Sequence, residues 1–363
     1  MSQIQLLGEV KILLQNARRY TVQQINLAMV KTYYQIGYLI VEYQQEGKSR
    51  AVYAAETLKY LSLELTKDFG KGFSVQNLER MRNFYLVYEK RFSEKKLNEF
   101  QTNSNSSTVS AIFQDEANSS TVSGIFKKAE IQFQLSWSHY VFLIGIDNVA
   151  ERNFYEIESI ENHWSLRELK RQFDSGLYER LALSRNKERI RELSEKGQII
   201  EQPQDIIKEP LVLEFLGLPE KYEYSETQLE NAIIDRLQDF MLELGKGFLF
   251  ESRQKRITFD EKHFYIDLSF YNRILRCFVL IDLKIGELSH QDIGQMQMYV
   301  NYYDRFVKQP DENQTIGIIL CKKKSEMLVE ISLPERNRQI FASKYQTVLP
   351  SKDDFKKLIE ATG

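Results

Sequence analysis

The region that decides the fold runs from Phe264 to Tyr299 and reads FYIDLSFYNRILRCFVLIDLKIGELSHQDIGQMQMY. Residues 262–271 and 276–285 are rich in aromatic and β-branched side chains and flank a turn signal, so they predict a β-hairpin. Charged residues inside such strands need a reason, because a buried charge without a partner is costly. Three of them occur here, Asp267 on the first strand and Asp282 and Lys284 on the second.

The spacing of these charges predicts that they meet. Asp282 and Lys284 are two residues apart, so they share a strand face about 7 Å apart at a rise of ~3.3 Å per residue. A two- or four-residue turn puts Asp267 on the same side as Asp282, whereas a three-residue turn puts it on the opposite side. With a four-residue turn at 272–275, Asp267 stands diagonal to Asp282, about 7–8 Å away.

Two carboxylates at this spacing can hold one Mg²⁺ ion, which prefers oxygen ligands and often takes one or two carboxylates. Lys284 would then lie beside the attacked phosphate or the attacking water. The alternative is a plain ion pair between Asp282 and Lys284, with Asp267 capping a turn. The cost of burying three clustered charges favours chemistry over stability as their reason.

Several segments together resemble a known family. An acid on one strand, acid-x-Lys on the next, and a helix carrying Gln295-x-x-x-Tyr299 resemble the PD-(D/E)XK nuclease superfamily. The remaining segments are similar to the YhcG-like family of helical-domain-plus-nuclease proteins, and the resemblance covers nearly the whole chain. They are LTKDFGKGFSVQNLERMRNFY (65–85), LSWSHY (135–140) and LENAIIDRLQDFMLELGKGFLFESRQ (229–254).

The resemblance implies a restriction-endonuclease-like α/β core and a role for each matching residue. Ile266 stands where the superfamily pattern has proline, and Asp282 stands where glutamate is more common, but neither departure removes a charge. The implied roles are metal ligands binding Mg²⁺ or Mn²⁺ for Asp267 and Asp282, the catalytic lysine for Lys284, an additional acid for Glu230, and substrate-contacting or supporting groups for Gln295 and Tyr299.

Composition sets broad limits. The chain has 363 residues, enough for two domains, with 42% hydrophobic and 28% charged residues as in ordinary soluble proteins. A net charge of −2 gives no global basic signature, so nucleic-acid contacts must come from local patches. Cys277 and Cys321 read as core thiols, and no cleavage signal or long apolar run is evident, so we expect a cytoplasmic protein.

The N-terminal half predicts helices. Apolar periodicity indicates two helices within 4–46 and a third over 52–69, and Ser74 is a good cap for a fourth. Helix, glycine turn and helix outline a helix-turn-helix. In a major groove the fourth helix would present Gln76, Asn77 and Arg80 to DNA. The alternatives are an αα-hairpin with a solvated polar face and a protein-binding surface.

Two further features concern the middle of the chain. Residues 101–126 contain the near-duplicates NSSTVSAIF and NSSTVSGIF, which predict a tolerated polar insertion. After a cap at Ser165, a predicted helix carries Arg167, Lys170 and Arg171. Such a cluster is ordinarily a solvated face, but beside a nuclease it becomes a candidate phosphate contact.

The predicted organisation is an all-α domain over 1–185, a linker over 186–210 and a nuclease-like domain over 211–363 with a mixed sheet flanked by helices. Glu230 lies in the first turns of a predicted helix over 226–244, where complementing the helix dipole is its alternative role. We expect a metal-dependent nuclease acting on nucleic acid, with DNA favoured. The helical domain would bind the target or form a homo-oligomer. The alternative is a non-catalytic nucleic-acid-binding or scaffold protein in a defence or restriction-type complex.

Overall fold

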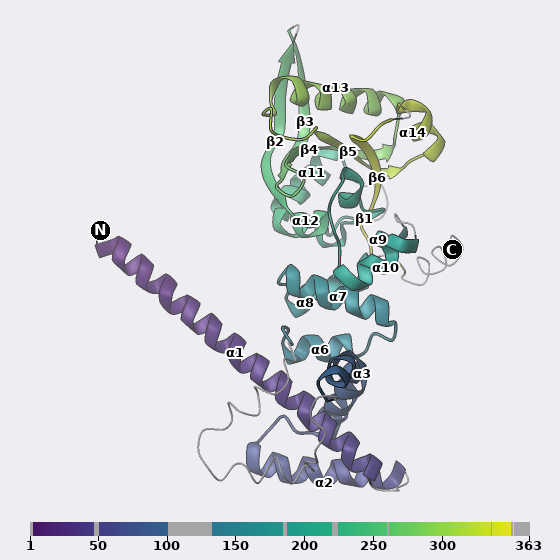
Figure 1. Cartoon of the computed structure of the whole chain (residues 1–363). Coiled ribbons are helices and arrows are strands. Elements are labelled where there is room, and N and C mark those ends of the chain that lie inside the picture. The colour runs from purple at the N-terminus through teal and green to yellow at the C-terminus, as the bar shows by residue number, and fades with distance from the viewer. Residues whose placement is uncertain are drawn as a thin grey trace. The chain divides into compact units, whose positions relative to one another are not determined.

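The chain divides into two compact units, Met1–Asp147 and Asn148–Gly363. The computed structural model (Figure 1) describes residues 3–46, 51–100, 133–183, 187–219, 224–259, 261–334, 336–349 and 351. The duplicated polar segment at 101–126 lies outside the described residues. Among the described helices, none has the length and apolar character that crossing a bilayer requires.

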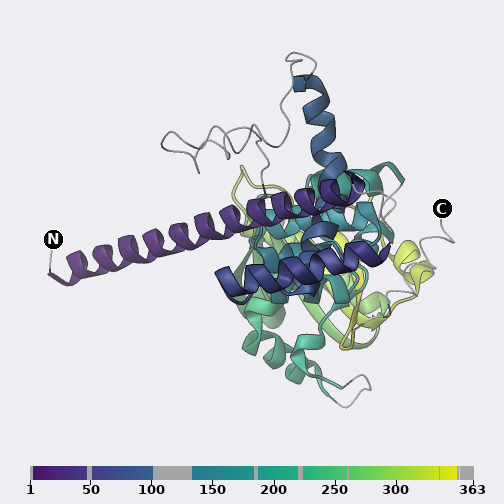
Figure 2. The ribbon, with the colours of Figure 1, turned by 90° about the horizontal axis from the view of Figure 1, so that it is seen from below.

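The first unit is helical. Where two helices were predicted within 4–46, the structure has one helix of 44 residues, so this prediction was wrong. Gly37 lies within this helix, and its lack of a Cβ permits close packing against the carbonyl oxygen of Met81. Figure 2 shows the length of this helix. The helices are α1 (Gln3–Glu46), α2 (Ala51–Phe69), α3 (Val75–Phe100) and α6 (Trp137–Leu143).

An aromatic cluster holds the first unit together. The ring of Phe84 on α3 lies 5.7 Å from Tyr34 on α1, 4.8 Å from Phe133 and 5.0 Å from Tyr140 on α6, measured between centroids. Aromatic pairs at these distances add to the stability that burial provides.

The second unit contains a six-stranded mixed sheet, as expected. The strand order is β1-β6-β5-β4-β3-β2, with β2, β3 and β4 antiparallel and the remaining pairs parallel. The strands are β1 (Leu211–Val212), β2 (Phe248–Phe259), β3 (Lys262–Asn272), β4 (Cys277–Glu287), β5 (Ile316–Lys323) and β6 (Ile340–Gln346).

Helices cover both faces of this sheet. One apolar cluster joins one face to α11 and α12, and a second joins the other face to α13 and α14. The predicted helix over 226–244 is interrupted at Arg236, so it forms two helices. The flanking helices are α11 (Glu226–Asp235), α12 (Leu237–Leu244), α13 (His290–Phe306) and α14 (Glu326–Ser332).

Three helices that the sequence analysis placed in the N-terminal domain, and one that falls within the expected linker, belong to the second unit. Buried ion pairs explain the difference: Arg180 is fully buried 2.6 Å from the Glu243 carboxylate of α12, and Arg171 lies 3.1 Å from the same carboxylate. The compact units therefore divide at Asp147. A domain linker at 186–210 stays a prediction. These helices are α7 (Val149–Glu161), α8 (Leu166–Asp174), α9 (Leu177–Leu183) and α10 (Lys187–Lys196).

The predicted hairpin forms as β3 and β4, but its register differs by one step. Asn272 pairs with Cys277, so the four-residue turn is 273–276 and not 272–275. The reason is that Asn272 holds the turn from within the strand, with Oδ1 accepting hydrogen bonds from the backbone N–H groups of Ile274 and Leu275 at 3.0 Å. Continued one step beyond its last pair, this register puts Asp267 opposite Asp282, not diagonal to it.

Candidate active site

Asp267, Asp282 and Lys284 lie together where β3 and β4 stop pairing. The Nζ atom of Lys284 is 2.9 Å from Oδ2 of Asp282. The backbone N–H of Leu283 donates a 2.8 Å hydrogen bond to Oδ2 of Asp267, which pulls that side chain toward β4. The two carboxyl groups are close enough to share a hydrogen bond. The three charges predicted to meet therefore lie together, with Asp282 in contact with both Lys284 and Asp267.

Asp282 is an unusual acid. Its burial, at 3% exposure, and then the negative charge of Asp267 raise its pKa to about 7, against the smaller opposing effect of Lys284. Burial acts to lower the pKa of Lys284, but the charge of Asp282 outweighs it and raises that pKa to about 12. The lysine is thus charged, while near neutral pH the carboxyl group of Asp282 is protonated in a large fraction of molecules. The single positive charge of Lys284 does not balance the two carboxylates of Asp267 and Asp282.

These residues suit a divalent cation. Oδ2 of Asp282 is buried and, apart from its ion pair with Lys284, accepts no well-aligned hydrogen bond from a described residue. Two crowded carboxylates are the donor set that Mg²⁺ or Mn²⁺ takes when substrate and water supply the other oxygens. In the described part of the chain no three His, Cys, Asp or Glu side chains converge, so such a site would have two protein carboxylates.

Glu230 is connected to Asp267 through the side chain of Gln254. Its Oε1 accepts a 3.0 Å hydrogen bond from Nε of Arg253, and its Oε2 accepts one of 2.7 Å from Nε2 of Gln254. The same Nε2 donates to Oδ1 of Asp267 at 3.0 Å. Both oxygens of Glu230 therefore have protein donors, and Gln254 connects this acid to the carboxylate pair.

The sequence analysis missed two of these neighbours. Gln254 adopts φ +45° in the middle of β2, a backbone conformation that is uncommon for glutamine and cannot be predicted from the sequence here. Asp292 lies with Oδ1 4.0 Å from Nζ of Lys284, while its Oδ2 accepts from the N–H of Ser289 in the cap of α13. The pattern Ser289-x-x-Asp292 could have predicted the helix start, but not its position beside Lys284.

Gln295 and Tyr299 support the strand that carries Asp267. The amide of Gln295 donates to the Tyr299 hydroxyl, which donates a 2.8 Å hydrogen bond to the carbonyl oxygen of Tyr265. Tyr299 is fully buried, and Tyr265 lies two residues before Asp267. The pair therefore holds β3 against α13 next to the site.

Comparison with known proteins covers both halves of the chain. Residues 204–360 match the family described as the YhcG PDDEXK nuclease domain, and residues 9–180 match the DUF1016 N-terminal domain. The Escherichia coli (strain K12) protein named "Putative nuclease YhcG" is 39% identical over 339 residues, which are 93% of this chain and 88% of that protein. The chain belongs to the YhcG family. Its carboxylate pair and Lys284 lie within the match to the nuclease domain.

Two solved structures are also similar in part. A repair endonuclease from Pyrococcus abyssi is 19% identical with a TM-score of 0.24, and the EndoMS–dsDNA2 complex is 16% identical with a TM-score of 0.25. Each similarity covers 37% of this YhcG-family chain and half the length of the other chain. Scores this low carry no argument about the site.

The three α3 residues predicted to contact DNA, Gln76, Asn77 and Arg80, differ in exposure and in hydrogen bonding. The side-chain amide of Asn77 donates to the carbonyl oxygen of Gly72 and accepts a 3.2 Å hydrogen bond from the indole of Trp137, so it holds the loop before α3. Gln76 is exposed and Arg80 is half-buried. Whether they contact nucleic acid stays a prediction.

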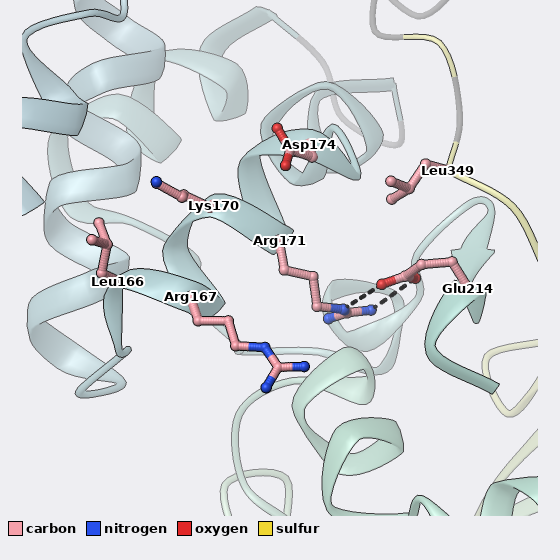
Figure 3. A pocket seen from close by; sticks show the side chains of 7 residues that line it. All are labelled: Leu166, Arg167, Lys170, Arg171, Asp174, Glu214 and Leu349. Atoms are coloured by element: carbon pink, nitrogen blue, oxygen red, sulfur yellow. Dashed lines mark hydrogen bonds and ion pairs between the residues drawn. The ribbon is translucent and has the colours of Figure 1, made fainter. Parts of the chain in front are cut away.

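The predicted basic cluster of α8 lines a pocket of about 450 Å³ (Figure 3). Arg171 points to Glu214, with Nε 2.7 Å from its carboxylate, and is only 15% exposed because it also pairs with Glu243. Arg167 and Lys170 are exposed. Arg171 therefore has a structural role in the second unit, and any phosphate contact of this cluster falls to the other two.

Proposed function

We propose that this YhcG-family protein is a divalent-metal-dependent nuclease that hydrolyses phosphodiester bonds in DNA. The observation that carries the proposal is the convergence of Asp267, Asp282 and Lys284 at one point. Paired carboxylates with an adjacent lysine suit an acidic, metal-binding centre with a fixed positive charge. Membership of the family and the name of the Escherichia coli relative support the same activity.

In this proposal Asp267 and Asp282 hold the cation. When bound, a divalent ion supplies a Lewis acid that polarises a phosphoryl oxygen and makes water a better nucleophile. The chain's own contribution is positional: the Leu283 N–H and the Gln254 amide fix both oxygens of Asp267. Lys284 donates to a phosphoryl oxygen, where its charge stabilises the negative charge that develops in the transition state.

The test is a cleavage panel with linear, circular, branched and single-stranded DNA and with RNA, in Mg²⁺, Mn²⁺ or chelator. We expect DNA cleavage that the chelator stops and that Asp267→Ala, Asp282→Ala and Lys284→Ala each abolish. Asp311→Ala is the matched control, because this aspartate is 73% exposed and pairs with Arg276 at the other end of the hairpin. Equal cleavage by wild type and the three site variants would refute the proposal.

The second candidate is a protein that binds nucleic acid or scaffolds a complex without turnover. The observation that favours this candidate is that, among the described residues, only two carboxylates are available to hold a metal ion. Glu230, the third acid, has both oxygens occupied by hydrogen bonds from Arg253 and Gln254. Calorimetric titration with Mg²⁺ and Mn²⁺ separates the two candidates. Metal affinity that Asp282→Asn removes supports the nuclease, whereas DNA affinity with neither metal binding nor cleavage supports the scaffold.

For the first unit we propose self-association through α1, with target binding by α3 as the other role. Its N-terminal part exposes a row of large apolar side chains, and such patches mark interaction surfaces. A second copy is the fitting occupant, because an antiparallel pair centred between Leu13 and Leu14 sets Glu9 opposite Arg18. The apolar side chains, 42–67% exposed, are Leu6, Leu7, Val10, Ile12, Leu13, Leu14, Val22 and Ile25.

Light scattering during gel filtration tests this assignment on the full chain. We expect a dimer for wild type and a monomer for the double variant Leu13→Lys, Leu14→Lys. Leu63→Lys is the control, since Leu63 on α2 is similarly exposed at 66%. A wild-type monomer, or a dimer that survives the double variant, would show that another molecule or another part of the chain covers α1.

A further inference from the structure

The hairpin of β2 and β3 extends beyond the rest of the sheet. β4 pairs with β3 only from Leu268 onward, whereas β2 and β3 continue to pair from Lys255 with Ile266 to Phe259 with Lys262. Figure 1 shows these two strands reaching past the others. We call residues 255–259 and 261–266 the ribbon. It begins at the residue next to Asp267, so it is continuous with the candidate active site.

One face of the ribbon is packed. Ile257 and Ile266 are 2% and 0% exposed and belong to the apolar cluster under α13. From the same helix, α13, the hydroxyl of Tyr299 donates a hydrogen bond to the carbonyl oxygen of Tyr265 on β3. The ribbon is thereby fixed relative to Asp267 and is not a free arm.

The other face is exposed and polar. Register pairs Arg256 with Tyr265 and Thr258 with His263, and all four residues are exposed. Tyr265 is 46% exposed, unusual for a large aromatic side chain beside an acidic site. Arg256 has no ion pair with any residue in the described part of the chain, whereas Arg253, just before the ribbon, is paired with Glu230. Within the described residues, the Arg256 guanidinium therefore has no ion-pair partner.

We propose that this exposed face binds the backbone of double-stranded DNA beside the scissile phosphate. Arg256 would contact a phosphate and Tyr265 would lie against a sugar or base. Further out, His263, whose Nδ1 shares a 2.9 Å hydrogen bond with the Thr258 hydroxyl, would donate from Nε2. This proposal rests on the proposed nuclease function for its placement next to a cleaved bond.

Geometry and charge favour a duplex as the partner. Because its other face is packed under α13, the ribbon can meet a duplex only with its exposed face, which suits contact along the backbone. At ~3.3 Å per residue, Tyr265 and His263 lie about 7 and about 13 Å along β3 from Asp267, which is about two to four base steps of ~3.4 Å. The guanidinium of arginine matches phosphate with two parallel hydrogen bonds. The row therefore follows a strand outward from the cleavage point.

The test measures DNA binding and not cleavage. The full-length protein is titrated into a labelled short DNA duplex in chelator, where a metal-dependent nuclease does not cut, over a range of salt concentrations. Arg256→Ala should raise Kd about tenfold and reduce the slope of log Kd against log salt by about 1, the value for one phosphate contact. Tyr265→Ser should raise Kd with little change in slope, because tyrosine carries no charge.

Arg273→Ala is the matched control. Arg273 is an exposed arginine at the opposite end of β3, and only its backbone N–H has a partner among the described residues, so its removal should leave Kd and slope within twofold of wild type. Equal thermal stability of all variants establishes that the fold is intact.

Each outcome decides the proposal separately from the nuclease function. Wild-type affinity and slope in Arg256→Ala and Tyr265→Ser overturn the DNA-binding face, as does absent duplex binding by wild type, which would leave a protein as the partner of this face. Binding that depends on Arg256 in a protein that cuts no substrate supports DNA binding by the ribbon and refutes the proposed nuclease. If Arg256→Ala cleaves DNA at the wild-type rate and binds it with the wild-type Kd, the nuclease function is supported and DNA binding by the ribbon is refuted.

Discussion

At the scale of single residues, Asp282 is the most informative side chain. Its pKa, raised to about 7 by burial and by Asp267, lies above the ordinary value of 3.8. A raised acid pKa means that the folded state binds the proton more tightly, so ionisation costs stability as pH rises from about 4 to about 7. Above about pH 7 the full cost of ionising Asp282 persists. Asparagine has nearly the same shape and no charge, so it removes this cost.

We therefore predict that Asp282→Asn is more thermostable than wild type at pH 8 without metal, and that the difference disappears toward pH 4. Three pKa units correspond to an upper bound of ~4 kcal/mol, and the lost ion pair with Lys284 reduces the gain. Thermal unfolding across this pH range in chelator measures it, with Asp311→Asn as the exposed control. A variant less stable than wild type at pH 8 would contradict the pKa assignment.

Gln254 supplies a second prediction at this scale. Its amide donates to both Glu230 and Asp267, so Gln254→Ala should loosen Asp267 and weaken Mn²⁺ binding about tenfold, as expected for a residue that orients a metal ligand. Calorimetric titration of Mn²⁺ measures this. Leu249→Ala, an exposed position on the same strand, serves as control. Unchanged affinity would mean that the Gln254 bridge does not position Asp267.

The sequence could identify the cluster of Asp267, Asp282 and Lys284 but not its surroundings. Acid and acid-x-Lys on adjacent strands are a pattern of local spacing, which is legible without coordinates. The contacts of Gln254 depend on a positive φ, and those of Arg171 depend on residues 43 and 72 positions away. A basic cluster such as 167–171 looks solvated in sequence because its buried partners lie elsewhere in the chain.

At the scale of elements, the contact between α13 and β3 positions the site. Tyr299→Phe removes the hydrogen bond to the carbonyl oxygen of Tyr265, and we predict a loss of ~1 kcal/mol in the free energy of unfolding. Urea unfolding measures the loss. Tyr302→Phe on the same helix should change it by less than ~0.5 kcal/mol, because no described residue bonds that hydroxyl. Equal effects of the two variants would argue against a positioning role for Tyr299.

Element prediction from sequence succeeded for type and failed for detail. Alternating apolar strands predicted the hairpin of β3 and β4, yet the turn was misplaced by one residue because Asn272 makes its capping bonds from inside the strand. Likewise, the periodicity in 4–46 identified helix but not the continuity of one helix over Gln3–Glu46.

At the scale of the whole molecule, buried charges join α8 and α9 to the unit that contains the sheet. Glu243 is fully buried, and burial raises its pKa, but Arg180, Lys208 and Arg171 outweigh this and lower it to about 2. Two of these cations come from helices that apolar periodicity alone assigns to the N-terminal half. The sequence could not show this, because ion pairing between distant segments leaves no periodic signal.

We predict that residues 148–363 unfold cooperatively as an isolated chain, while residues 211–363 do not. The shorter chain lacks Arg171, Arg180 and Lys208, and removing partners from a buried charge costs ~3–5 kcal/mol. Circular dichroism during thermal unfolding compares the two chains. Equal stability would place the boundary back at the linker expected from the sequence.

We propose that Asp267, Asp282 and Lys284 act as one metal-dependent hydrolytic centre. The most direct test is the single-turnover rate of DNA cleavage in Mg²⁺ by wild type and by Asp267→Ala. A decrease of about 100-fold or more in a variant that remains folded is the predicted result. Cleavage at the wild-type rate by that variant would contradict the claim.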